Sequence, residues 1–275
     1  MLDAVGIAAV AVLCFLVAFV YANLGLGGGL LFVPILLSFG VGGGETANLV
    51  AVPISLALTI ATASAAILTH RRKGLVDAAS ARVLIPGAFL GTLAGTAVNV
   101  FLLSRPTFLL FFTAVLLAFG VLMLREKLRG GDEDRDHDGR YTPRRKAAAS
   151  AASVGSGFFS GAAGVGGGLI NVPILTVILG RRARKAVGTS SLVIVPVALL
   201  GFVLTLGLNT WKGGATLPED FALIPLLLPL VFLGAYLGST IGLRRVRTRT
   251  VTLVFIALIF VTAGKLIAVD LLRLA

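Results

Sequence analysis

A glycine-rich phrase of twelve residues occurs twice in this chain and constrains its fold more than any other feature. Residues 25–36 read GLGGGLLFVPIL, and residues 164–175 read GVGGGLINVPIL. Nine of the twelve positions are identical. Because the two copies are separated by close to half of the chain, the phrase indicates an internal duplication.

The composition of the chain predicts a membrane protein. It has 57% hydrophobic and 13% charged residues, which is too few charges to cover a water-soluble globule of this size. A helix that crosses the hydrocarbon core of a bilayer needs about 20 apolar residues. Stretches of that kind lie at 3–23, 49–69, 83–103, 107–124, 186–208, 221–243 and 250–272.

The basic residues are concentrated in alternate loops. Of the 24 Lys and Arg residues, 20 lie in the segments 71–82, 125–146, 181–185 and 244–249. Basic loops mark the cytoplasmic face of a membrane protein. The net charge of +12 is therefore interpreted as a topology signal, with lipid headgroups and not nucleic acid as the anionic partner. We expect a multi-pass protein of the plasma membrane with both termini external.

These assignments predict two halves of opposite orientation. The first repeat covers residues 1–124, a charged cytoplasmic linker covers 125–146, and the second repeat covers 147–275. The predicted fold is an all-α integral membrane protein with two inverted-topology repeats. Each repeat has a glycine-rich hairpin with a short or broken helix and three spanning helices, which makes about eight full spans, or about ten with the short helices. Secondary transporters commonly bind their substrate between such repeats.

The glycine phrases lie at the turns of the two hairpins, where they predict an anion site. Glycines let several main-chain N–H groups converge, and the short helix that follows directs its positive amino end to the same point. The candidate ligands are the N–H groups of Gly27, Gly28 and Gly29 and of Gly166, Gly167 and Gly168. The alternative is that these glycines only permit close helix packing, as small residues do in membranes.

A few polar residues near the turns could complete the hydrogen bonds of an oxyanion. Asn171 follows the second glycine turn, Thr189, Ser190 and Ser191 begin the next apolar span, and Asn48 begins the matching span of the first half. Hydroxyls in membrane helices also bond to their own backbone, so a structural role stays open for each of them.

Catalytic and metal chemistry find little support in the chain. It has two histidines, one cysteine and no acidic residue deep within an apolar span. Residues 134–145 begin like a calcium-binding loop but have Arg145 where a bidentate glutamate is needed. We therefore expect neither an enzyme nor a bound metal or cofactor.

The paired glycine phrases, the loop His70-Arg-Arg-Lys-Gly74 and the run Ala186-Val-Gly-Thr-Ser190 before Val195-Pro196 together resemble the TauE/SafE family of sulfite and organosulfonate permeases. The resemblance covers both halves, except for the charged linker. It implies substrates such as sulfite, sulfoacetate or related sulfonates, exported from the cytoplasm. The first half departs from the pattern, because it has Ala47-Asn-Leu49 in place of Gly-Thr-Ser.

The sequence thus predicts a secondary transporter that exports a small sulfur anion by alternating access of one repeat against the other. An anion channel that uses the same half-helix sites is the alternative. The expected partners are the anion and the lipid bilayer, and a homodimer is left open.

Overall fold

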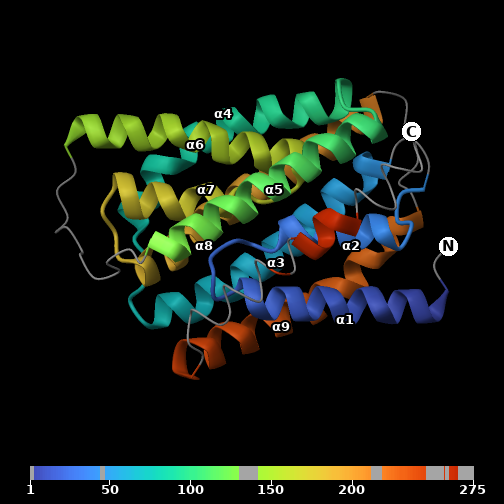
Figure 1. The fold of residues 1–275 in the computed structure, drawn as a ribbon, viewed down its shortest axis with the longest axis horizontal. Helices are drawn as coiled ribbons and strands as arrows, with labels where there is room; N and C mark the ends of the chain where they lie inside the picture. Colours follow the sequence, from blue (N-terminus) through green and yellow to red (C-terminus); the bar gives the residue numbers. More distant parts are fainter. Residues whose placement is uncertain are drawn as a thin grey trace.

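The computed structural model describes residues 3–43, 47–129, 142–211, 219–245, 257 and 260–265, and in this part of the chain every regular element is helical. The first half contains α1 (Ala4–Tyr21), α2 (Gly29–Ser38), α3 (Ala47–Arg72), α4 (Ala78–Phe101) and α5 (Arg105–Arg129). The second half contains α6 (Pro143–Ala163), α7 (Gly168–Pro173), the π-helical turn η1 (Ile174–Ile178), α8 (Ala183–Trp211), the 3-10 turn η2 (Glu219–Ala222) and α9 (Leu223–Arg245). Figure 1 shows them as a bundle of long helices.

The helices agree with the apolar stretches of the sequence. Within the described residues, five segments are long and apolar enough to cross a bilayer, namely α1, α3, α4, α8 and the segment Asp220–Ile241 that contains most of α9. The expected short helices after both glycine turns are present as α2 and as α7 with η1. The stretch 250–272 and most of the linker lie largely outside the described residues. An all-helical membrane fold is therefore confirmed, and the full number of spans stays a prediction.

Helix boundaries follow from local capping chemistry. The carboxylate of Asp3 accepts from the N–H of Gly6 at the start of α1, and Asp77 caps α4 in the same way. Thr142 caps α6, whose first residue, Pro143, has no N–H to leave unpaired. Because α5 continues to Arg129 and α6 begins at Pro143, both helices extend into the predicted linker.

The two halves pack against each other through glycine-lined helix contacts. In α4, Gly87, Gly91 and Gly95 lie against backbone carbonyls of α6, so that a Cβ at any of these positions would overlap with α6. In α9, Gly234 and Gly238 lie in the same way against carbonyls of α1. Small residues of this kind let helices approach closely in a membrane, where the hydrophobic effect does not drive helices together.

These contacts correspond between the halves. Gly91 meets the carbonyl of Val154, and Gly234 meets the carbonyl of Phe15. The number of residues between Phe15 and Val154 equals the number between equivalent positions of the two glycine phrases. Gly91 and Gly234 are separated by slightly more residues. In each half, therefore, the first helix packs against a late helix of the other half. Figure 1 shows that α1 begins at one end of the bundle and α6 begins at the opposite end.

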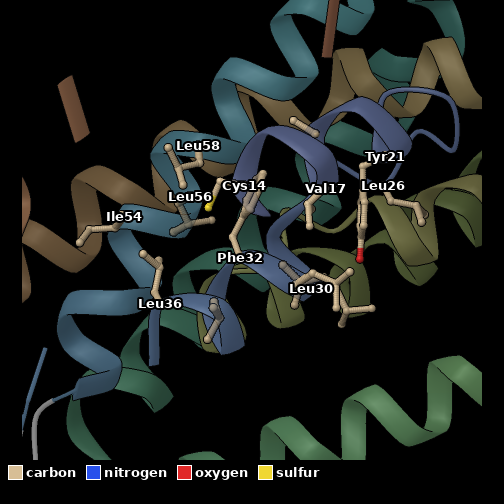
Figure 2. Packing of buried hydrophobic residues seen from close by; sticks show 14 of the residues in the cluster. Cys14, Val17, Tyr21, Leu26, Leu30, Phe32, Leu36, Ile54, Leu56 and Leu58 are labelled. Carbon is tan, nitrogen blue, oxygen red and sulfur yellow. The ribbon is translucent and has the colours of Figure 1, made fainter. Parts of the chain in front are cut away.

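The core of the molecule surrounds α3, which is buried along most of its length. Figure 2 shows Cys14 and Val17 from α1 and Phe32 and Leu36 from α2 gathered against α3. The outer surface of the bundle is also apolar, with exposed residues such as Trp211 and Leu90. A surface of this kind is suited to lipid.

Candidate functional site

The two glycine turns contact each other inside the bundle. We call residues 25–29 the first turn and residues 164–168 the second turn. A Cβ added to Gly29 would overlap with the carbonyl oxygen of Gly164, and a Cβ added to Gly168 would lie 2.6 Å from the carbonyl oxygen of Gly25. Close packing, one of the two roles expected for these glycines, therefore holds at Gly29 and Gly168.

The backbone of both turns has conformations that favour glycine. The φ angles are +77° at Gly27 and +98° at Gly28 in the first turn, and +77° at Gly166 and +74° at Gly167 in the second. A residue with a side chain would be strained at these positions. The repeated phrase thus encodes the same backbone path twice.

The N–H groups of the two turns are the main-chain donors of the candidate site. Within the described residues, no hydrogen bond uses the N–H groups of residues 27–29 or 166–168 as donors. The residues Gly28 and Gly167, which precede α2 and α7, provide no side-chain cap. All six residues are buried. Unpaired buried N–H groups are rare in proteins, so this cluster of donors is unusual.

Two serines hold the carbonyl groups of the turns. The hydroxyl of Ser190 on α8 donates to the carbonyl oxygen of Gly25 at 2.7 Å, and that of Ser55 on α3 donates to the carbonyl oxygen of Gly164 at 2.9 Å. Each half therefore supports the turn of the other half. Judged by these contacts, the residue of the first half that is equivalent to Ser190 is Ser55 and not Asn48. The two halves are offset here because the connection from the short helix to α8 is shorter than the connection from α2 to α3.

Two further side chains contact both turns at once. A Cβ at Gly27 would lie 2.8 Å from Cγ2 of Thr59 and 3.3 Å from Ile194, and a Cβ at Gly166 would lie 2.5 Å from Cγ2 of Thr59 and 3.4 Å from Ile194. Thr59 is completely buried, and its hydroxyl has no hydrogen-bond partner in the part of the chain that the structure describes. Sequence analysis missed this residue, because nothing in the motif marks a threonine on the third helix.

The second turn has polar support that the first turn lacks. Asn171, on the first turn of α7, accepts a hydrogen bond of 2.7 Å through Oδ1 from the hydroxyl of Ser156, which also lies 2.9 Å from the carbonyl oxygen of Gly167. Nδ2 of Asn171 is buried and has no hydrogen-bond partner among the described residues. Asn171 was predicted as a candidate and lies beside the turn, whereas Ser156 was missed.

Asn48 belongs to a separate network. Its Nδ2 donates to Oδ1 of Asn99 at 2.9 Å, and Nδ2 of Asn99 donates to the carbonyl oxygen of Ala162 at 2.7 Å. The network joins α3, α4 and α6, and it reaches α6 just before the second turn. The structure thus connects Asn48 with the second turn through Asn99.

The loop between α3 and α4 packs against the Gly-Thr-Ser run at the start of α8. Oγ1 of Thr189 accepts from the N–H of Asp77 at 2.9 Å, and a Cβ at Gly188 would overlap with the carbonyl oxygen of Leu75. The hydroxyl of Ser191 donates to the carbonyl oxygen of Val187 in its own helix at 3.1 Å. In this structure, these contacts give the run a role in docking the loop.

An ion pair joins the halves at this end of the bundle, which we call the Asp77 end. The carboxylate of Asp77 pairs with the guanidinium of Arg181, and both side chains are largely buried. Ser80 donates to Oδ2 of Asp77 at 2.6 Å. Burial alone would raise the pKa of Asp77, but the hydrogen bond from Ser80 and the charge of Arg181 outweigh it and hold that pKa below its usual value.

The opposite end, the Asp220 end, has a simpler contact at the corresponding place. Oδ2 of Asp220 accepts from the N–H of Gly42 at 2.8 Å. Gly42 and Arg181 lie at the same distance in sequence after their glycine phrases. Asp77 and Asp220 are separated by the same number of residues as the equivalent pair Gly91 and Gly234. The two ends therefore share an acidic residue, but only the Asp77 end pairs it with a charged side chain within the described residues.

The chemistry of the site is that of neutral donors. Among the described residues, no three His, Cys, Asp or Glu side chains gather as a metal site would require. The groups at the turns are backbone N–H groups, two carbonyl oxygens that serine hydroxyls hold, the side chain of Thr59 and the amide of Asn171. Such an arrangement can replace the hydration shell of a small anion.

Comparisons with known proteins identify the family of the chain. A family model described as "Sulfite exporter TauE/SafE" matches residues 10–266. A "Probable membrane transporter protein" of Xylella fastidiosa (strain 9a5c) is 30% identical over 192 residues, which cover 70% of this chain and 69% of that protein. No solved structure matches the chain significantly.

Proposed function

The chain belongs to the TauE/SafE sulfite exporter family and is a multi-pass membrane protein, and from this premise we propose that it is a secondary transporter for a small sulfur anion. The substrate is sulfite, sulfoacetate or a related sulfonate, exported across the plasma membrane. Membership in a transporter family agrees with the prediction that the chain is not an enzyme.

The observation that carries this proposal is the pair of glycine turns with unused N–H groups. The amino end of a helix carries about half a positive charge, so two such ends supply about one charge to a bound anion. The proposed ligands are the N–H groups of residues 27–29 and 166–168 together with the amide of Asn171.

The other predicted side chains have internal partners in this structure. Ser190 and Ser191 donate to carbonyl oxygens, Thr189 accepts from the loop before α4, and Asn48 donates to Asn99. Ser190, Ser191 and Asn48 donate to the anion only if these internal bonds open during the transport cycle, whereas Thr189 uses its oxygen as an acceptor and keeps its hydroxyl hydrogen.

Alternating access between inverted repeats is the proposed mechanism. It is supported by the reciprocal packing of α4 on α6 and of α9 on α1, and by the opposite directions of α1 and α6. A two-fold arrangement of this kind lets one repeat rock against the other about a central site. External termini and a homodimer stay predictions.

A carrier is favoured over an anion channel by the contact between the turns. Gly29 and Gly168 touch the opposite turn at its backbone, so the two turns are in direct contact at these positions. A pore would need continuous space for a hydrated or partly hydrated ion. The channel is therefore the second candidate.

Transport by the purified protein in liposomes tests the proposal. Radiolabelled sulfite should enter protein-containing vesicles with saturable kinetics, and the series should be repeated with a pH gradient, with a membrane potential and with neither. Empty vesicles and vesicles with excess unlabelled sulfoacetate are the controls. Flux of channel magnitude would support the pore, and sulfur-anion flux equal to that of empty vesicles would refute both transport proposals.

A further inference from the structure

We propose that Thr59 and Asn171 are the side-chain donors that recognise the anion at the glycine turns. This inference rests on the proposed transport function and adds Thr59, which no motif marks, to the binding site. It also assigns the ligand a chemical class, a small and fully deprotonated oxyanion.

The position of Thr59 carries the first step. Thr59 from α3 and Ile194 from α8 each touch both glycine turns, and of these two only Thr59 has a polar atom. The hydroxyl of Ser55 also lies at both turns, but it donates to the carbonyl oxygen of Gly164 and lies 3.4 Å from that of Gly29. A Cβ at Gly27 or Gly166 would lie within 2.8 Å of its methyl group, so the side chain points toward both turns. The methyl group faces the turns, and the hydroxyl is attached to the same Cβ beside it.

The hydroxyl of Thr59 differs from those of several other threonines in the bundle, which bond to their own helix. Thr62, on the next turn of α3, donates to the carbonyl oxygen of Leu58 at 2.9 Å, and Thr92 and Thr205 likewise donate to the residue four positions before them. Thr59 makes no such bond and is completely buried. A buried unsatisfied hydroxyl costs free energy, and a ligand that accepts its hydrogen bond removes this cost.

The amide of Asn171 is, among the described residues, a second unused donor beside the turns. The hydroxyl of Ser156 lies 2.7 Å from Oδ1 of Asn171 and 2.9 Å from the carbonyl oxygen of Gly167, and these two acceptors share its one hydrogen. Nδ2 then keeps two hydrogens that no described residue accepts, at a side chain that is completely buried. Because Asn171 lies on the first turn of α7, this amide lies close to the N–H groups of the second turn.

The surrounding serines make the site selective for an acceptor. Ser55 and Ser190 occupy the carbonyl oxygens of Gly164 and Gly25, so two groups that would repel an anion are engaged elsewhere. Backbone N–H groups and the amide of Asn171 can only donate at this place. A ligand that keeps an acidic proton would find few acceptors for it, which favours the deprotonated oxyanion.

Binding measurements on matched threonine variants test the inference. Calorimetric titration of purified protein with sulfite should show that Thr59→Val, which keeps the shape of the side chain, weakens binding about tenfold to a hundredfold, because it removes a donor to a charged ligand. The melting temperature of ligand-free Thr59→Val should stay equal or rise. Thr59→Ser should keep the affinity within about threefold.

Two further variants complete the design. Thr62→Val removes a hydroxyl that serves its own helix and should leave the affinity for sulfite unchanged. Asn171→Asp keeps an acceptor for Ser156 but replaces the donor by an anionic oxygen, so it should weaken binding at least as much as Thr59→Val. Asn171→Asp therefore tests the role of Asn171 as a donor beside the second turn, independently of Thr59.

The outcomes separate this inference from the proposed function. If the wild-type protein binds sulfite and folded Thr59→Val binds it within threefold of wild type, Thr59 is not a ligand and this inference fails alone. If the wild-type protein neither binds nor transports sulfite, sulfoacetate or another sulfur anion, the proposed function fails and the inference fails with it.

Discussion

The two glycine turns share a sequence and a backbone path but differ in what surrounds them. In the first turn, a Cβ at Gly28 would overlap with the ring of Phe32; in the second, a Cβ at Gly167 would overlap with the hydroxyl of Ser156. Asn171 occupies the position that corresponds to Phe32. The first turn is therefore backed by an apolar side chain and the second by a polar pair.

This difference shows how a duplicated scaffold can divide its tasks. The glycines that shape the backbone are the same in both halves, because any side chain would disturb the contact between the turns. The residues behind the turns are free to diverge. In this chain the polar side chains proposed as ligands are Asn171, beside the second turn, and Thr59, while the apolar side chain of Phe32 packs in the core behind the first turn, as Figure 2 shows.

The largest expected effect comes from the glycines that join the turns. Gly29→Ala and Gly168→Ala should each prevent correct folding or cost about 3 kcal/mol or more, since their Cβ atoms would meet backbone of the opposite turn. Gly29→Ala should be the worse of the two. The measurement is the monodisperse fraction in size-exclusion chromatography together with the melting temperature.

Gly207→Ala in α8 is the matched control for these variants. It has open space around its Cβ position and should stabilise the helix by about 0.5 to 1 kcal/mol. If Gly29→Ala were as stable as Gly207→Ala, the direct contact between the two turns would be disproved.

The two ends of the bundle provide the next comparison. Asp77→Asn breaks a largely buried ion pair and leaves Arg181 without its charged partner, so it should destabilise the protein by about 3 to 5 kcal/mol. Asp220→Asn keeps an oxygen that can accept from the N–H of Gly42 and should cost about 1 kcal/mol. Melting temperatures of the two variants measure the difference, and equal losses would contradict the asymmetry.

The acid stability of the protein should depend on Asp77. Because its folded-state pKa is lowered, the carboxylate stabilises the protein fully above its unfolded-state pKa of about 3.9, and this contribution is lost as the pH falls toward the lower folded-state value. A melting series from pH 6 to pH 3 should therefore show a decline below about pH 4 in the wild type. The decline should be smaller in Asp77→Asn, and identical pH profiles would exclude Asp77 as its source.

The smallest expected effects come from the serines that hold the turns. Ser55→Ala and Ser190→Ala each remove one hydrogen bond between helices and should lower stability by about 0.6 to 1.5 kcal/mol, by similar amounts in the two variants. Affinity for sulfite should stay within about threefold of wild type in both. A strong loss of affinity in Ser190→Ala without a change in the melting temperature would instead place its hydroxyl on the anion.

Much of the fold and part of the candidate site were predictable from the sequence. Hydropathy located the long helices, and the glycine phrase located the turns and short helices, because both signals act over a few consecutive residues. The positive φ angles at Gly27, Gly28, Gly166 and Gly167 agree with the need for glycine there. Asn171 was found because it lies within the repeated phrase.

The tertiary structure alone decided which side chains meet those turns. Ser55, Thr59 and Ser156 lie on helices that are distant from one or both turns in sequence, and no local pattern distinguishes them from other hydroxyl residues of apolar helices. Ser190 carried the recognisable motif, yet its hydroxyl donates to the backbone of the first turn. Short-range patterns determine backbone conformation, whereas the packing of α3 and α8 around the two turns determines which donors remain unpaired.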